Sequence, residues 1–460
     1  MLKKFSLILL ILVISTLALA QGVMNFAPKS ANVVAVFENN SQNYSALKKA
    51  PLFSFLLDDL GIESLIKSSV SQTALSINTK TSQIWNAIQN DFVIFGKRDM
   101  NSKSEFSVAA VFKSNSNMVM NLLSSFIGGN LGTQKINDVT FKTFEANGLT
   151  IYALDHDEYV LLSNSPNLII DSVNSYDGKS PSFKAFGNVP SDSWFSIYFK
   201  DEFSKDSTSD VIPKDMFTYG KVKGNSLSIT GVSEFEYKNK TLKSKILSFK
   251  SNAKSLETTP ATGDFWVAAD VADPVELYKL VKNYAKGWKT DKLPVLNEKE
   301  VLDLVGHMNG KVFMYANAGS SKEDYVASVY LSKDISKYIP NISKTASATF
   351  KWQGHTVLRN DTVEGTRTTS DYTIFYQDKV IFSNMAPEDV SKYLKVPTKA
   401  EDVGNYSSFS NQVWNNAFVI GYVDIGNIIE NALQYTLKSG AIFQAKTDSN
   451  ADFVWQLILR

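Results

Sequence analysis

Two stretches of this sequence decide its fold: Val33-Val34-Ala35-Val36-Phe37 and, about 220 residues later, Phe265-Trp266-Val267-Ala268-Ala269. Each stretch follows a proline, Pro28 or Pro260, and each runs into an acidic residue. Short runs of β-branched and aromatic residues are typical of buried strands. We therefore expect the chain to begin the same structural unit twice.

The later elements repeat in the same order, and each half carries a Ser-Asn pair, Ser163-Asn164 or Ser383-Asn384, just before a proline that opens a helix. Short strands with polar hairpin links, and helices that do not alternate one-for-one with strands, favour antiparallel sheets. We predict an α+β fold with helices packed on antiparallel sheets, in two similar domains from an internal duplication. The predicted domains are residues 21–255 and 256–460. The matched strands are 92–95 with 312–315, 108–112 with 326–330, 159–164 with 379–384, and 195–201 with 418–424.

The helices of the second half have the clearer boundaries. Asp273-Pro274-Val275-Glu276 has the pattern of a capping box and predicts a helix over 274–288. A second helix is expected over 298–308, with Gly310 as its C-cap. In the first half, Pro51 interrupts a helical region over 44–57.

Residues 1–20 have the organisation of a signal peptide. Lys3 and Lys4 precede an apolar run, and Ala18-Leu19-Ala20 fits the small-x-small cleavage pattern. We expect cleavage after Ala20 and an extracytoplasmic protein, periplasmic or secreted. The alternative is a retained membrane anchor, although the apolar run is shorter than the ~20 residues that span a bilayer. No later segment is long and apolar enough to span a membrane as a helix.

Composition excludes several function classes. The chain has no cysteine, which rules out disulfides, thiolate metal sites and thiol nucleophiles. A formal net charge of +1 provides no general attraction for nucleic acid, so no nucleic-acid partner is expected. Export without disulfides also means that packing alone stabilises the fold.

The search for catalytic and metal-binding patterns predicts no catalytic residue, no metal site and no cofactor. The densest group of potential ligands is Asp155-His156-Asp157-Glu158, where strand alternation places His156 on the opposite face from its acidic neighbours. We interpret this segment as a solvated turn, with a metal site as the alternative. His307 and His355 lie in other elements, and the Gly-x-Ser-x-Gly motif of serine hydrolases is absent.

Acidic residues recur where strands end and helices begin: Glu38, Asp201, Asp270 and Asp424. Four carboxylates at comparable positions could line one cleft. Helix capping explains the same positions with fewer assumptions, and we favour it.

With this organisation, the chain resembles an exported bacterial family known only as a domain of unknown function (number three-three-five-two). The resemblance rests on the proline-led openings at Pro28 and Pro260, the strand-acid-helix units and the duplication behind a signal peptide. It covers most of the mature chain. It implies export and no established activity, and it assigns no site residues.

We expect an exported, non-enzymatic envelope or secreted protein with a binding or structural role and an unknown protein or apolar ligand as partner. The alternative is a carrier of lipid or another apolar ligand, and a hydrolase is the third possibility. The carrier hypothesis rests on the expected strand Trp194-Phe195-Ser196-Ile197-Tyr198-Phe199, because it has aromatic residues on both faces. The candidate ligand-facing residues are Trp194, Tyr198, Trp266 and Tyr422.

Overall fold

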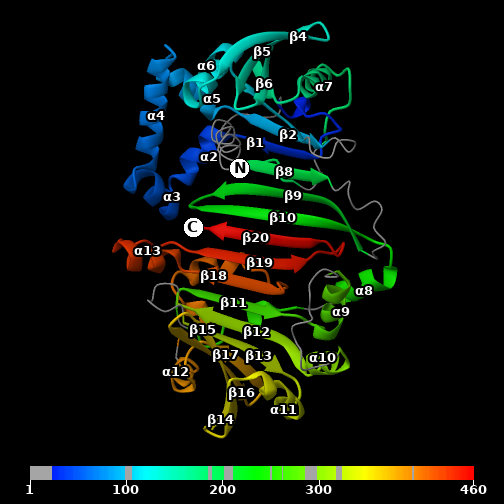
Figure 1. Ribbon diagram of the computed structural model, residues 1–460, viewed down its shortest axis with the longest axis vertical. Helices are drawn as coiled ribbons and strands as arrows, with labels where there is room; N and C mark the ends of the chain where they lie inside the picture. The colour runs from blue at the N-terminus through cyan, green and yellow to red at the C-terminus, as the bar shows by residue number, and fades with distance from the viewer. Residues whose placement is uncertain are drawn as a thin grey trace. The chain divides into compact units, whose positions relative to one another are not determined.

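The chain divides into two compact units in the computed structural model (Figure 1). Unit 1 comprises residues 1–207 and 213–236, and unit 2 comprises residues 208–212 and 237–460. The division at 236/237 comes earlier in the chain than the boundary expected at 255/256. The predicted signal peptide and its cleavage site lie outside the described residues. The structure describes residues 23–98, 106–184, 189–200, 211–248, 251–261, 263–284, 298–317, 324–395 and 398–460.

Unit 1 is built on antiparallel strands in the order β9-β8-β1-β2-β3-β7-β6-β5-β4, with β10 beside β9. The central strand β1 has the bounds that its run of valines predicts. The strands are β1 (Val33–Phe37), β2 (Phe92–Arg98), β3 (Phe106–Lys113), β4 (Asn130–Ile136), β5 (Val139–Ala146), β6 (Leu149–His156), β7 (Tyr159–Ser163), β8 (Phe195–Lys200), β9 (Val211–Lys223) and β10 (Ser226–Tyr237).

Unit 2 contains antiparallel strands in the order β20-β19-β18-β11-β12-β13-β17-β16-β15-β14. Its central strand β11 begins at the predicted residue and extends one residue further. The strands are β11 (Phe265–Asp270), β12 (Met308–Ala316), β13 (Tyr325–Leu331), β14 (Ala348–Trp352), β15 (His355–Glu364), β16 (Arg367–Tyr376), β17 (Lys379–Ser383), β18 (Val419–Val423), β19 (Ala441–Thr447) and β20 (Phe453–Leu459).

Helices complete both units, so the fold class is the expected mixture of helices and antiparallel sheet. Among the described residues, none of the helices has the length and apolar character needed to cross a membrane. The α-helices are α2 (Asn40–Leu47), α3 (Pro51–Ser54), α4 (Ile62–Ser76), α5 (Thr81–Gln89), α6 (Ser116–Ile127), α7 (Pro166–Tyr176), α8 (Lys240–Ser248), α9 (Pro274–Tyr284), α10 (Glu298–Val305), α11 (Ile339–Ile342), α12 (Pro387–Tyr393) and α13 (Ile425–Leu433).

Each unit has its main core on one face of its sheet. In unit 1 the buried core includes Val34 and Val36 of β1 and Leu168 of α7. In unit 2 it includes the fully buried rings of Trp266 and Tyr422. Side chains alternate between the two faces of a strand, so the core residues are every second residue of the central strands.

The two Ser-Asn pairs predicted as repeated joints make the same contacts in their units. In Ser163-Asn164, the serine Oγ donates to the carbonyl oxygen of Val108 at 2.7 Å, and the asparagine Oδ1 accepts from the amide of Val108 at 2.8 Å. In Ser383-Asn384, the corresponding atoms meet the carbonyl and amide of Tyr325 at 2.6 and 3.1 Å. Each pair therefore continues the backbone pairing of a strand edge with side-chain atoms.

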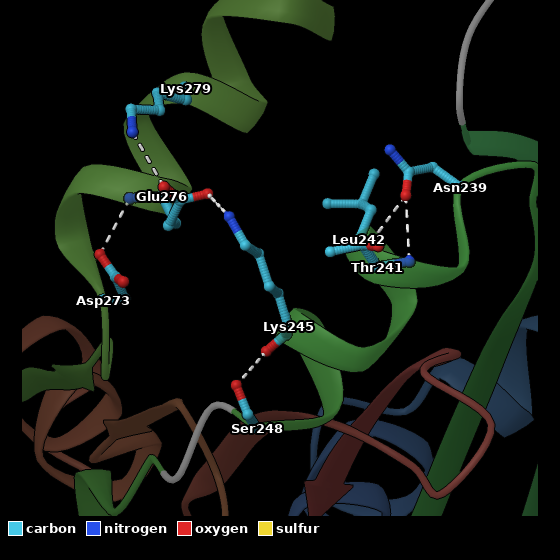
Figure 2. A network of polar contacts seen from close by, with 8 residues as sticks. All are labelled: Asn239, Thr241, Leu242, Lys245, Ser248, Asp273, Glu276 and Lys279. Carbon is cyan, nitrogen blue, oxygen red and sulfur yellow. Dashed lines mark hydrogen bonds and ion pairs between the residues drawn. The ribbon is translucent and has the colours of Figure 1, made fainter.

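The start of α9 forms part of the predicted capping box (Figure 2). Asp273 Oδ1 accepts from the amide of Glu276 at 2.9 Å. The Glu276 carboxylate instead pairs with Lys279 at 2.9 Å and with Lys245 of α8 at 3.1 Å. Lys279 and Lys245 together hold the pKa of Glu276 below its ordinary value. This carboxylate therefore links α8 to α9 and does not complete the box.

Gly310 has a different role from the predicted helix C-cap. The helix ends earlier, at Val305, and Gly310 lies inside β12 at a register shift between Met308 and Val312. Its φ is 83°, and a Cβ placed there would lie 1.8 Å from the carbonyl oxygen of Val271. The position requires glycine both for its backbone conformation and for this close approach.

Candidate ligand-binding face

The four aromatic residues proposed as ligand-facing lie mostly in the closed cores. Tyr198 is 3% exposed, and Trp266 and Tyr422 are fully buried. Trp194 is half-buried just before β8, and its Nε1 donates to Asn40 Oδ1 at 2.5 Å. A ligand contact at these rings stays a prediction.

Trp266 and Tyr422 belong to one aromatic group in unit 2. The ring of Trp266 lies 4.9 Å from that of Tyr406 and 6.3 Å from that of Tyr422. Tyr422 Oη accepts from the amide of Asn405 at 2.7 Å. Burial, with the nearby carboxylate of Asp424 adding to it, raises the pKa of Tyr422 well above its ordinary value. Tyr422 is therefore a neutral structural group at physiological pH.

The opposite faces of the same strands are apolar and partly open. In β1, Val34 and Val36 are buried, whereas Val33, Ala35 and Phe37 are half-buried on the other face. In β8, Ser196 and Tyr198 face the core, and Ile197 on the other face is 38% exposed. The sequence predicted an uncovered apolar face on the side of Trp194 and Tyr198. The partly open face of β8 is instead the one that carries Ile197.

An apolar row crosses the face of the unit 1 sheet opposite the main core, open at Ile197 and closed at Ala110 and Leu162, which are 3% and 8% exposed. Directly opposed residues of antiparallel strands lie on the same face, so the register defines the row. Ala35 faces Ile197 on one side and Ile94 on the other. The row then continues through Ala110 to Leu162. We call these five residues the unit 1 row.

A second, aromatic row runs beside it. Phe37 stacks on Phe92 with ring centroids 4.4 Å apart, and its centroid lies 5.8 Å from that of Phe195. The ring of Phe195 extends over Gly220, where an added Cβ would lie 2.2 Å from a ring carbon. Part of this side of the sheet is covered, because Phe92 and Leu162 also pack with residues of α6.

Unit 2 presents a row of the same kind. Val267 of β11 faces Gly421 of β18 and Met314 of β12, and Phe443 and Phe382 at the two ends are 40% and 39% exposed. All six residues are apolar or glycine. We call them the unit 2 row: Phe443, Gly421, Val267, Met314, Ala327 and Phe382.

Two carboxyl groups lie at the end of β1 in unit 1, Asp91, which is buried, and Glu38, which is half-buried. Asp91 is 1% exposed, its Oδ1 accepts from the amide of Asn39 at 3.1 Å, and its Oδ2 has no partner among the described residues. Burial raises the pKa of Asp91 to about 8 and also raises the pKa of Glu38. Asp91 is therefore largely protonated near neutral pH, which removes a charge beside the apolar rows.

The two acidic strand ends of unit 2, Asp270 and Asp424, do not share one cleft. Asp424 Oδ1 caps α13 by accepting from the amide of Asn427 at 3.0 Å, so the capping interpretation is confirmed there. Asp424 comes directly after Val423, which pairs with Phe265 at the start of β11. Asp270 is the last residue of β11, and its Oδ2 accepts from the amide of Asn252 at 2.9 Å. A six-residue strand separates the two by roughly 17 Å. Glu38 lies in unit 1, and Asp201 lies outside the described residues.

The segment Asp155–Glu158 is only partly the solvated turn that was predicted. Asp157 and Glu158 are exposed between β6 and β7. His156 is half-buried, with its ring 5.5 Å from that of Tyr176 and its Nε2 3.0 Å from Asp177 Oδ1. The prediction is wrong for His156 because α7 supplies a packing surface that the local sequence does not reveal.

Comparisons with known proteins give no family. No protein-family model matches the chain, and no curated protein matches it. Solved structures of TP0453 show low similarity. Crystal form IV is 10% identical over 46% of this chain and 80% of that chain, with a TM-score of 0.26. Crystal form I is 13% identical over 46% and 79%, with a TM-score of 0.24, and crystal form III is 11% identical over 82% and 98%, with a TM-score of 0.20.

Proposed function

We propose that this protein is an exported, non-enzymatic binding protein of the cell envelope or its surroundings, and that the unit 1 row and the unit 2 row are its binding surfaces. The observation that carries the proposal is the partly open apolar face of each sheet. Contiguous exposed apolar surface is costly in water, and proteins retain it where something binds.

Export rests on the sequence of residues 1–20. A positive start, an apolar run and Ala18-Leu19-Ala20 together direct secretion and cleavage. The test is N-terminal sequencing of the protein purified from its native cells, combined with fractionation. Gln21 as the first residue in the extracytoplasmic fraction supports the proposal, whereas Met1 retained on a membrane-bound form contradicts cleavage.

Internal duplication is part of the same proposal. Each unit has a central strand, β1 or β11, with the next strand of the chain on one side and β8 or β18 on the other. The Ser-Asn joints make matching contacts, and each opening proline forms an isolated bridge, Pro28 with Ser182 and Pro260 with Lys399. Such agreement at unusual positions supports a common origin more strongly than similar strand composition does. An experimental structure in which strands 108–112 and 326–330 occupy different places would contradict it.

The preferred ligand is an apolar chain, as in a lipid. Six adjacent strands spaced ~4.8 Å apart give the unit 2 row a length of roughly 24 Å. This exceeds the ~15 Å that one leaflet of a bilayer's hydrocarbon core occupies. None of the six residues of the unit 2 row carries an ionisable side chain.

The binding test uses the full mature chain and a fluorescent long-chain fatty acid. Ile197→Glu and Phe443→Glu each place a carboxylate in a row, where its desolvation opposes contact with an acyl chain. We expect each variant to weaken binding by at least about fivefold. The matched control is Leu65→Glu on α4, because Leu65 is 68% exposed and lies outside both rows. Absence of fatty-acid binding by the native protein, or equal loss in the control, would contradict the lipid proposal.

A protein partner is the alternative occupant of the same faces. Mass spectrometry of the protein purified from its native envelope separates the two, since co-purifying lipid supports the carrier and a stoichiometric protein supports a docking role. The same two variants should release that partner if it binds at the rows.

A further inference from the structure

A cleft of about 420 Å³ lies in unit 1 between the end of α4, one side of α5 and the start of α6. Its volume is within the range of small-molecule sites. Its wall is mainly uncharged and polar, and it differs in this from the apolar rows. The amide side chains on the wall are those of Gln83, Asn86, Asn90, Asn115, Asn117 and Asn121.

Helical spacing gathers these amides. Gln83, Asn86 and Asn90 follow one another at intervals of three and four residues along α5 and the residue after it, so they share one side of that helix. Asn117 and Asn121 are four residues apart on α6. Two helices therefore each present a stripe of amides to the same cleft.

Several of these polar groups have unused hydrogen-bonding capacity. The exposed side chains of Asn86 and Asn121 make no hydrogen bond to the described part of the protein. Ser114 Oγ, also on the wall, is buried with no partner among the described residues. A buried hydroxyl without a partner is unfavourable, and rotation of the Ser114 side chain toward the cleft would let a ligand satisfy it.

The cleft is also close to neutral. Its one ionised side chain among the described lining residues is Lys113, whose Nζ pairs with Glu158 at 2.7 Å. Asn90 Nδ2 donates to the carbonyl oxygen of Lys113 at 3.2 Å, which fixes the edge of the cleft. A neutral wall offers no net attraction to a charged ligand.

The fold itself does not demand these amides. After β13, the strand of unit 2 that occupies the position of β3, the chain continues as Ser332-Lys333-Asp334. There, Lys337 pairs with Asp303 of α10 at 2.7 Å. In unit 2 an ion pair therefore occupies the region after β13, where unit 1 has the amides after β3, and the amide cleft is a feature of unit 1.

We propose that this cleft binds a neutral carbohydrate. The side chains of Asn86 and Asn121 each offer two N–H donors and one carbonyl acceptor, which complements sugar hydroxyls that both donate and accept. Asn115 Oδ1 and Asn117 Oδ1 already accept hydrogen bonds from the protein, so these two residues offer their N–H groups. Ile77 and Met118 on the same wall provide apolar contact for the C–H face of a sugar ring. This proposal is independent of the lipid proposal, because it concerns other residues and a ligand of opposite polarity.

The experiment is saturation-transfer NMR and calorimetry on the full mature chain, with N-acetylglucosamine, its linear trisaccharide and maltotriose as probes. We expect saturation transfer to at least one of them. We also expect binding about tenfold weaker in the double variant Asn86→Ala, Asn121→Ala, which removes two amide partners. Asn415→Ala, at an exposed asparagine of unit 2, is the matched control and should bind as the native protein does.

Ser114→Ala separates a ligand role from a structural role. Because Ser114 Oγ has no partner within the described part of the chain, we expect the variant to retain its melting temperature while its affinity for the sugar falls. The trisaccharide binding more tightly than the monosaccharide would indicate an extended glycan as the natural source. Absence of saturation transfer to all three probes at millimolar concentration, or transfer that is unchanged in the double variant, would overturn the proposal.

Discussion

Replacing Asp91 by asparagine should stabilise unit 1 at neutral and alkaline pH. The Asp91 carboxyl is buried, one of its oxygens has no partner among the residues that the structure describes, and burial raises its pKa from 3.8 to about 8. A carboxyl whose pKa is higher in the folded state favours folding fully below pH ~4, where both states are protonated. That contribution is lost as the pH rises through about 8, because the unfolded chain ionises freely and the folded chain does not.

The size of the effect follows from the pKa shift. About four pKa units, at 1.36 kcal/mol each, set an upper limit of about 6 kcal/mol. Local relaxation and water entry around the charged form recover part of this. We therefore expect Asp91→Asn to raise the free energy of unfolding by about 2–3 kcal/mol at pH 8 and by less than ~1 kcal/mol at pH 4. The pKa of Glu38 is also raised by burial. The free energy of unfolding of the variant should therefore still fall as the pH rises, but less steeply than in the native protein.

Amide hydrogen exchange of the whole mature chain between pH 5 and 8 measures this locally. Protection of β1 and β2 should increase in Asp91→Asn relative to the native protein, while β11 and β12 in unit 2 serve as the internal reference. Glu145→Gln, at an exposed carboxyl of β5, is the matched control and should change nothing. Equal protection of native protein and Asp91→Asn at pH 8 would refute the assignment of a buried, high-pKa carboxyl.

Three further predictions concern single contacts. Gly310→Ala should destabilise unit 2 by about 3 kcal/mol in urea unfolding, because a positive φ and the Val271 carbonyl both oppose a Cβ, whereas Gly365→Ala, with a positive φ but open space, should cost only about 1 kcal/mol. Tyr422→Phe should cost about 1–2 kcal/mol, since the Asn405 amide loses its acceptor, and an unchanged urea midpoint would contradict that bond. Trp194→Ala should cost about 3 kcal/mol and Trp194→Phe about 1 kcal/mol; similar losses in both would show that the hydrogen bond to Asn40, and not ring packing, dominates.

Local sequence patterns were sufficient to predict secondary structure where the conformation of a residue depends mainly on its neighbours in the chain. The run Val33–Phe37 fixes a strand, because β-branched alternation favours extended backbone whatever packs upon it. Pro166 and Pro387 start helices for the same local reason, since proline is favoured in the first helical turn. The ordered repetition of such signals predicted the α+β class and the position of the central strands.

The choice between the two faces of those strands required the tertiary structure. Strand alternation places Trp194 and Tyr198 on one side and Ile197 on the other, but both sets are apolar, so sequence alone does not reveal which side is covered. The core forms where α7 and the other helices pack, and this leaves Ile197 on the open side. The same limit explains Gly310, whose requirement arises in part from the carbonyl of Val271, which follows β11.

The sequence by itself determined the absence of thiol chemistry and predicted the element types and an export signal, because each depends on composition or on neighbours along the chain. Only the tertiary structure decided that Asp91 is buried, that Ser114 Oγ meets no partner in the described ranges and that amides from two helices share a cleft. Burial and hydrogen-bond satisfaction depend on segments that are distant in sequence, and side-chain desolvation sets the pKa values and binding chemistry that follow from them.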